Sequence, residues 1–120
     1  MPTFDAGDVK RVPFPYADRS TRQHRPALVV SNGEIGDGGV LLWVVMITSA
    51  ENRRWAGDLE IEDLEGAGLP APSIIRPCKI ATIEVRHAEP LGRIKPALMA
   101  ESSDVLAGLL DLGRRSSRDR

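Results

Sequence analysis

The chain has 120 residues, of which 42% are hydrophobic and 28% charged, as in one ordinary globular domain. Its net charge of −1 excludes a protein held to nucleic acid by bulk positive charge alone, and its single cysteine, Cys78, excludes an intramolecular disulfide. The first ten residues do not look like a signal peptide, and the longest apolar run, residues 40–47, is too short to span a bilayer. No His, Cys, Asp and Glu cluster has metal-ligand spacing, so we expect a cytoplasmic protein that uses no metal or cofactor.

Strand patterns dominate the first two-thirds of the chain. Residues 9–12 predict a first short strand, which Pro13 and Pro15 should end because proline cannot donate a hydrogen bond to a β ladder. A helical turn is expected within residues 62–68, where glycines and a following proline should end it. The other expected strands are residues 27–31, 40–48 and 58–62, and residues 73–83 are expected to form one or two strands around Pro77.

The C-terminal segment changes to a helical period. Ser102 or Ser103 should cap a helix that has one apolar face and ends at Gly113. Several short strands followed by one helix predict a mainly β (α+β) fold, a small barrel or strongly curved sheet with a helix packed on it. The domain is expected to cover residues 1–115, with residues 116–120 as a frayed basic tail.

Charge is unevenly distributed along the chain. Residues 8–25 and residues 76–95 each carry five basic against two acidic residues, and the acidic segment 51–65 lies between them. The two basic segments can build one positive face on a nearly neutral protein, although charge alone favours the interpretation as solvated loops.

The two strands on either side of the glycine-rich turn permit a geometric prediction. If Ser31 pairs with Val40, then Arg25 lies opposite Met46, and Thr48 is its diagonal neighbour on the same face. A guanidinium and a hydroxyl would then converge at one end of the sheet. A slip of one residue would place them on opposite faces.

Three stretches of the chain carry a family resemblance: GDVKRVPFPYADRSTRQHRPALVVS at 7–31, MITS at 46–49 and GDLEIEDLEGAGLPAPSIIRPCKIATI at 57–83. The chain resembles the MazF/PemK-like toxins of bacterial toxin–antitoxin systems over about residues 7–112. The resemblance implies an SH3-like barrel with a C-terminal helix, usually a homodimer. It also implies metal-independent cleavage of single-stranded RNA at short sequences, a cognate antitoxin as partner, and a bacterial cytoplasmic location.

The resemblance also assigns candidate catalytic residues. Arg25 and Thr48 match by position the catalytic arginine and hydroxyl residue of the family, and Arg76 matches a second arginine of PemK-type members. Cys78 stands where some of those members have an aspartate, which leaves the general base open. An arginine fork suits two phosphate oxygens, and a hydroxyl can add a neutral donor as the 2′-oxygen attacks phosphorus. The products implied are a 2′,3′-cyclic phosphate and a 5′-hydroxyl.

Six further side chains are candidates for contacting the RNA. Tyr16 lies in a proline-broken loop beside basic residues, where an aromatic ring can stack on unpaired bases. Trp55 lies in a polar loop that is hard to bury, whereas Trp43 is expected in the core or in a dimer interface. Arg76 is equally interpretable as a phosphate contact or as a solvated strand residue. The six candidates are Arg76, Ser49, Arg22, Tyr16, His24 and Trp55.

Two alternative functions keep the same fold. CcdB-like gyrase poisons use this barrel, but those that bind gyrase depend on a tryptophan at the end of the terminal helix, and this chain ends in GRRSSRDR. A non-catalytic binding or regulatory module is the other alternative, because Cys78 departs from the family pattern and the net charge is close to zero.

Overall fold

A computed structural model describes residues 4–15 and 23–112 of the chain. The strands are β1 (Asp8–Phe14), β2 (Gln23–Val29), β3 (Leu41–Ser49), β4 (Leu59–Glu60), β5 (Ser73–Glu84) and β6 (Glu89–Arg93). The helices are α1 (Leu64–Ala67) and α2 (Pro96–Leu109), and the 3-10 turns are η1 (Asp37–Gly39) and η2 (Val85–His87). Tyr16, Arg22, Gly113 and the predicted tail at 116–120 lie outside the described residues.

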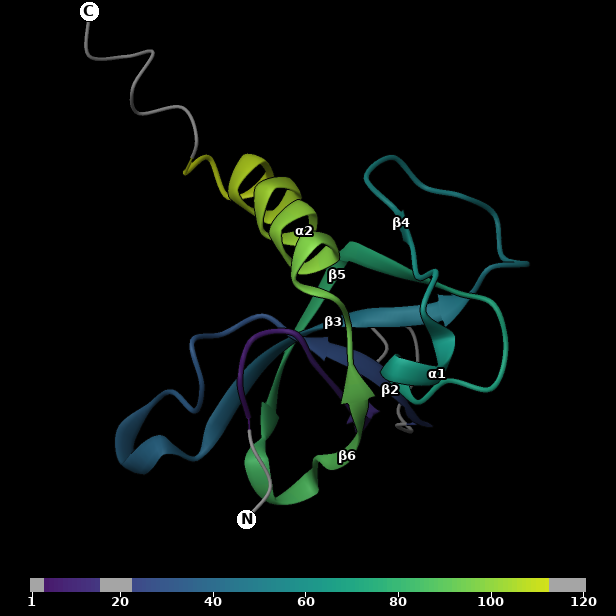
Figure 1. Ribbon diagram of the computed structural model, residues 1–120. Coiled ribbons are helices and arrows are strands. Elements are labelled where there is room, and N and C mark those ends of the chain that lie inside the picture. The colour runs from purple at the N-terminus through teal and green to yellow at the C-terminus, as the bar shows by residue number, and fades with distance from the viewer. Residues whose placement is uncertain (1–3, 16–22, 113–120) are drawn as a thin grey trace, which may run out of the picture.

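The strands form one antiparallel sheet in the order β4-β5-β3-β2-β1-β6. The sheet curls strongly, and α2 rises from it with its C-terminal end pointing away from the strands (Figure 1). The predicted class, mainly β with a C-terminal helix, is confirmed. In the part of the chain that the structure describes, no helix is long and apolar enough to cross a membrane.

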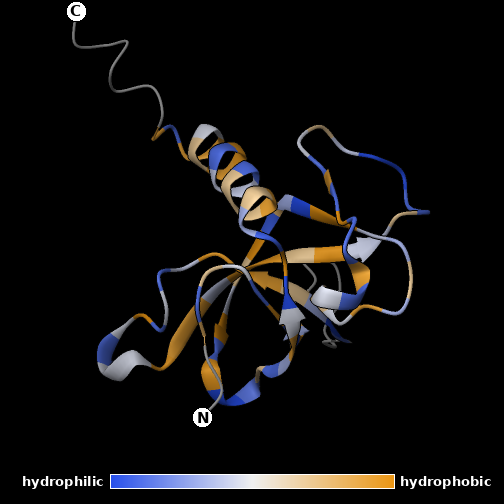
Figure 2. Cartoon of the chain, viewed as in Figure 1, coloured by the Kyte–Doolittle hydropathy of each residue, from blue (hydrophilic) through white to orange (hydrophobic). Residues whose placement is uncertain are grey.

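The side chains of β3 alternate between two hydrophobic clusters, which lie on opposite faces of the sheet. Leu42, Val44 and Met46 belong to one cluster, whereas Val45 and Ile47 belong to the other. The apolar colour of β3 runs through the middle of the molecule, and the polar colours gather in the loops (Figure 2). The strand therefore packs on both faces over these five positions.

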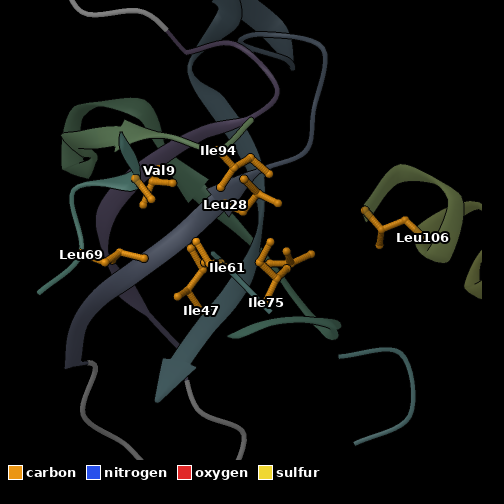
Figure 3. Close-up of a cluster of buried hydrophobic side chains, with 10 residues drawn as sticks. Val9, Leu28, Ile47, Ile61, Leu69, Ile75, Ile94 and Leu106 are labelled. Carbon is orange, nitrogen blue, oxygen red and sulfur yellow. The ribbon is translucent and has the colours of Figure 1, made fainter. Parts of the chain in front are cut away.

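The cluster that contains Val45 connects the sheet to both helices (Figure 3). It joins Leu28 of β2 and Ile75 of β5 to Ala67 of α1 and Leu106 of α2. Trp43, two residues before Val45 on the same strand, is 50% exposed, so of its two predicted places the core is wrong and a dimer interface stays a prediction.

Pro13 and Pro77 are among the prolines that lie inside strands, so the prediction that Pro13 ends the first strand is wrong. β1 runs past Pro13 at a point where its pairing with β6 has already stopped, so the missing N–H costs no hydrogen bond on that side. β5 runs past Pro77, where its register with β3 shifts across residues 77–79, as in a bulge.

Helix α2 begins at Pro96, well before the predicted cap at Ser102 or Ser103. Proline is favoured in the first turn because its missing N–H would have no partner inside the helix there. Ser102 is buried within the helix, and its Oγ donates to the Leu98 carbonyl oxygen at 2.8 Å, so it satisfies its hydroxyl without capping.

The short helix α1 packs closely on β6. Its N-terminal Asp63 side chain accepts from the Gly66 N–H at 3.1 Å, and Gly68 ends it in the left-handed region with φ 73°, as predicted for this glycine. A Cβ at Gly68 would overlap the carbonyl oxygen of Leu91, so the approach of α1 to β6 requires glycine there.

Candidate functional site

Arg25 and Thr48 lie just beyond the paired part of β2 and β3, whose ladder ends at Ala27 and Met46. Ala27 pairs with Met46, and continuing this register by two residues brings Arg25 level with Thr48. The predicted pairing of Arg25 with Met46 is therefore wrong by two residues. Because the error is an even number, both side chains stay on one face when this register is continued.

Arg25 and Thr48 line the same cavity, which has a volume of about 270 Å³. Ser49 and Asn52 contribute to its polar lining, and the mostly apolar segment 69–73 forms a further part of it. The cavity lies where β2 begins and β3 ends, so it opens at one end of the sheet. The structure thus brings together three of the residues singled out in the sequence and adds Asn52.

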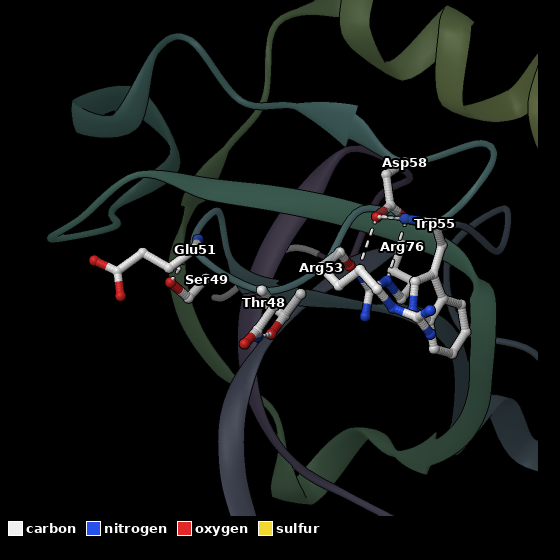
Figure 4. Close-up of polar contacts among 8 residues, drawn as sticks. Thr48, Ser49, Glu51, Arg53, Trp55, Asp58 and Arg76 are labelled. Carbon is white, nitrogen blue, oxygen red and sulfur yellow. Dashed lines mark hydrogen bonds and ion pairs between the residues drawn. The ribbon is translucent and has the colours of Figure 1, made fainter.

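Thr48 is held by a side chain that the sequence did not indicate. Its Oγ1 accepts a hydrogen bond of 2.6 Å from Asn52 Nδ2 (Figure 4). Thr48 is only 8% exposed. Because the oxygen accepts this bond, the hydroxyl proton is left to donate to another acceptor. The neighbouring Ser49 is exposed, and its Oγ accepts from the Glu51 N–H at 3.1 Å.

Arg76 lies outside the lining of this cavity and is 6% exposed, so its interpretation as a solvated strand residue is wrong. Its Nε and Nη2 donate to the two carboxylate oxygens of Asp58 at 3.2 and 2.9 Å, and Nη2 also donates to the Arg53 carbonyl oxygen at 2.7 Å. The guanidinium lies over the Trp55 ring, 4.2 Å from its centroid (Figure 4). Its prediction as an RNA contact stays a prediction.

Asp58 is the charge partner of this arrangement, and its side chain is 1% exposed. Burial raises the pKa of this carboxyl, but the hydrogen bonds from Arg76 and from the Trp55 N–H and the positive charges of Arg76 and Arg54 act in the opposite direction. These stabilising contacts outweigh burial, and the pKa lies below its usual value of 3.8. The carboxylate is therefore charged at neutral pH.

The other predicted contact residues are spread over the surface. His24 is exposed and lines a second cavity, of about 430 Å³, with Arg86 and His87. It does not share the cavity of its neighbour Arg25, because consecutive side chains of a strand point to opposite faces. Trp55 is partly buried against Arg76 and has the Lys79 ammonium 5.4 Å from its ring centroid.

Cys78 is exposed on β5. Within residues 4–15 and 23–112, no group of three or more His, Cys, Asp and Glu side chains is placed to hold a metal ion. Tyr16 and Arg22, the remaining predicted contacts, belong to the part of the chain that is not described.

Comparisons with known proteins agree on one family. A family model described as "PemK-like, MazF-like toxin of type II toxin-antitoxin system" matches residues 5–110. No curated protein sequence matches the chain significantly.

Solved structures share the fold. The chain is similar to MazF (Form-I) from Deinococcus radiodurans with a TM-score of 0.71 and 22% identity, over 92% of this chain and 99% of that one. It is also similar to an endoribonuclease in complex with its cognate antitoxin from a mycobacterial species, with a TM-score of 0.69 and 23% identity, over 93% and 97%. The MazE–MazF complex (Form-II) from Deinococcus radiodurans gives a TM-score of 0.67 and 21% identity, over 92% and 97%.

Proposed function

Since the chain belongs to the family of PemK-like, MazF-like toxins of type II toxin–antitoxin systems, we propose that it is a sequence-specific, metal-independent endoribonuclease that cleaves single-stranded RNA. The observation that carries this proposal is the placement of Arg25 and Thr48 in one cavity where β2 begins and β3 ends. A permanently charged planar fork and a hydroxyl donor within one cavity are what stabilisation of a phosphoryl group requires.

The proposed reaction is an internal transfer at phosphorus. The 2′-oxygen of the nucleotide before the cut loses its proton and bonds to the adjacent phosphorus, and the bond from phosphorus to the 5′-oxygen breaks. That 5′-oxygen takes up a proton, so the products are a 2′,3′-cyclic phosphate and a 5′-hydroxyl. Arg25 would bind two phosphoryl oxygens. Thr48, whose oxygen already accepts a hydrogen bond from Asn52, would donate a hydrogen bond to the phosphoryl oxygen on which negative charge develops.

The substrate and protein partners are part of the same proposal. Ser49 lines the catalytic cavity, and His24 and Trp55, with Tyr16 and Arg22 outside the described residues, are proposed to contact the RNA on either side. A cognate antitoxin would occupy the same surface, and the protein would act in the bacterial cytoplasm.

Self-association is also proposed, and the exposed apolar side chains support it. Trp43 and Ile80 are 50% and 46% exposed on the neighbouring strands β3 and β5. Because Val45 pairs with Ile80, these two side chains are diagonal neighbours on one face of the sheet. An exposed tryptophan and isoleucine side by side fit an interface with a second copy of the chain.

The decisive experiment incubates the purified, antitoxin-free protein with a long single-stranded RNA in EDTA and maps the cuts by primer extension. We expect discrete cuts at one short sequence, with 2′,3′-cyclic phosphate and 5′-hydroxyl ends. Arg25→Ala should abolish them while keeping the fold. RNA binding without cuts, over a wide range of sequences, would instead identify a non-catalytic binding module.

A further inference from the structure

We propose that Arg76 is a positioning residue in this protein and not a ligand of the RNA phosphate. Paired with Asp58, it holds the segment 52–58 so that Asn52 orients the hydroxyl of Thr48. The inference rests on the proposed function for its effect on cleavage, and its structural part can be tested without RNA.

The guanidinium of Arg76 is already occupied by protein partners. Its Nε and Nη2 bind Asp58 in a two-point contact, and its face is covered by Trp55. The Arg76 side chain is only 8% exposed, and a phosphate that took the same two-point edge would displace the Asp58 carboxylate and leave it buried without its main partner, which is strongly unfavourable. The buried pair has no net charge, so it contributes little attraction for a polyanion.

The contact that matters for catalysis is the one to the main chain. Arg76 Nη2 donates to the carbonyl oxygen of Arg53, the residue that follows Asn52. On the other side of Asn52, its own N–H donates to the Ser49 carbonyl oxygen at 3.1 Å. The backbone is therefore held on both sides of Asn52, and its Nδ2 is thereby placed 2.6 Å from Thr48 Oγ1.

Asp58 completes the support of this segment. Its Oδ2 accepts from the Trp55 N–H at 2.8 Å as well as from Arg76 Nη2, so one carboxylate joins the strand residue to the loop backbone. Trp55 in turn lies over the guanidinium and shields the ion pair from water. A loop held at residues 53, 55 and 58 gives Asn52 few alternative positions.

The two possible roles of Arg76 predict different salt dependence of RNA binding. Binding would be measured with a short RNA that carries a 2′-deoxy nucleotide at the cut, so that it cannot be cleaved. For a phosphate ligand, Arg76→Gln should flatten the plot of log K against log salt by about 0.7, the expected slope per contact on a single strand. For a positioning residue the slope should not change, whereas Arg25→Gln, the matched control, should flatten it by about that amount.

Kinetics and a double variant provide the positive readout. We expect Arg76→Gln to lower kcat about 10- to 100-fold with little change in KM, as for a small misplacement of a reacting group. Asn52→Ala should lower kcat similarly, and the double variant should be no worse than the single variants because both act through Thr48. Asp58→Asn should also lower kcat; if it tightens RNA binding instead, the released guanidinium is a phosphate ligand and the inference is wrong.

Amide hydrogen exchange separates this inference from the proposed function, because it needs no RNA. In Arg76→Gln, exchange should accelerate at residues 52–58 and stay unchanged in β2 and β3. Unchanged exchange in that segment overturns the inference even if the protein cleaves RNA. If Arg76→Gln does not fold, the same measurement on Asp58→Asn decides the question, and a wild-type protein that cuts no RNA refutes the proposed function alone.

Discussion

At the scale of single residues, Thr48 and Ser49 offer two adjacent hydroxyls in different surroundings. Thr48 Oγ1 is held by Asn52 inside the cavity, whereas Ser49 Oγ accepts from the main chain and its residue is exposed. Thr48→Val removes the hydroxyl and keeps the shape, and we expect it to lower kcat about 100-fold or more, as for loss of one preorganised donor. Single-turnover cleavage of an RNA that contains the cut site measures this.

The neighbouring residue provides the control for that prediction. Ser49→Ala should lower the rate far less, and Thr48→Ser should keep most of it because the donor is retained. If Ser49→Ala is instead the inactive variant, the catalytic hydroxyl has been assigned to the wrong residue.

Asp58 predicts a pH dependence of stability. Its pKa is lower in the folded protein than in the unfolded chain, because hydrogen bonds and positive charge outweigh burial. The charged carboxylate therefore stabilises the fold above the unfolded-state pKa, and this contribution is lost as pH falls through the folded-state pKa. We expect the difference in free energy of unfolding between wild type and Asp58→Asn to be largest near neutral pH and to shrink below about pH 4.

Urea denaturation at a series of pH values checks this expectation. Asp37→Asn, which changes an exposed aspartate in η1, is the control and should leave the free energy of unfolding nearly unchanged throughout. A difference for Asp58→Asn that is constant from pH 7 to pH 3 would contradict the ion-pair explanation.

That Arg25 and Thr48 lie on one face could be predicted from sequence, but the residues that surround them could not. Arg25 and Thr48 depend on side-chain alternation in paired strands, and a register error of two residues preserves that alternation. The pairing of Arg76 with Asp58 joins residues 18 positions apart through a loop, and periodicity carries no information on such contacts. Asn52 was missed for the same reason, because only the conformation of the turn after β3 brings it to Thr48.

At the scale of elements, replacing two glycines with alanine should change the free energy of unfolding in opposite directions. Gly68 directly follows α1, and Gly108 lies inside α2. Gly68 has a φ of 73°, and a Cβ there would overlap the Leu91 carbonyl oxygen on β6. We expect Gly68→Ala to lower the free energy of unfolding by about 2 kcal/mol or more. Gly108 lies in α2 with no neighbouring atom near a Cβ position, so Gly108→Ala should raise that free energy by about 0.5–1 kcal/mol.

Thermal and urea unfolding of the two alanine variants measure these changes. The pair is matched because the same side chain is added in both. Equal effects at the two positions would contradict the close packing of α1 on β6.

The sequence located most elements, and the errors have physical causes. Pro13 was expected to end a strand, but it lies where β1 no longer pairs with β6, and Pro77 lies where the ladder is bulged. The start of α2 was misplaced because Ser102 satisfies its hydroxyl within the helix, whereas Pro96, which begins the helix, is also typical of loops. Strand β6 was not predicted, since it contains a proline and a glycine and lies at the edge of the sheet.

At the scale of the whole molecule, the exposed Trp43 and Ile80 predict self-association. We expect the wild-type protein to be a dimer and Trp43→Asp to raise its dissociation constant about 30-fold or more, as for a buried tryptophan at an interface. Light scattering coupled to size exclusion, over a range of concentrations, measures this.

Val40 supplies the matched control for the dimer prediction. It is 48% exposed, close to the value for Trp43, but it precedes β3 and does not lie on that strand. Val40→Asp should therefore leave the dimer intact. A dimer that survives Trp43→Asp would place the interface elsewhere.

The turn between β2 and β3 lies at the far end of these strands from Arg25 and Thr48 (Figure 1). Gly36, Gly38 and Gly39 all have positive φ there, and the turn is largely exposed. About 15–20 Å of strand separates it from the cavity. A cysteine introduced at Asp37 in a Cys78→Ser background would thus give a single attachment point for a dye or a tether, with the cavity facing solution. Binding of single RNA molecules, the proposed substrate, could then be followed on an immobilised protein whose cavity is not blocked by the attachment.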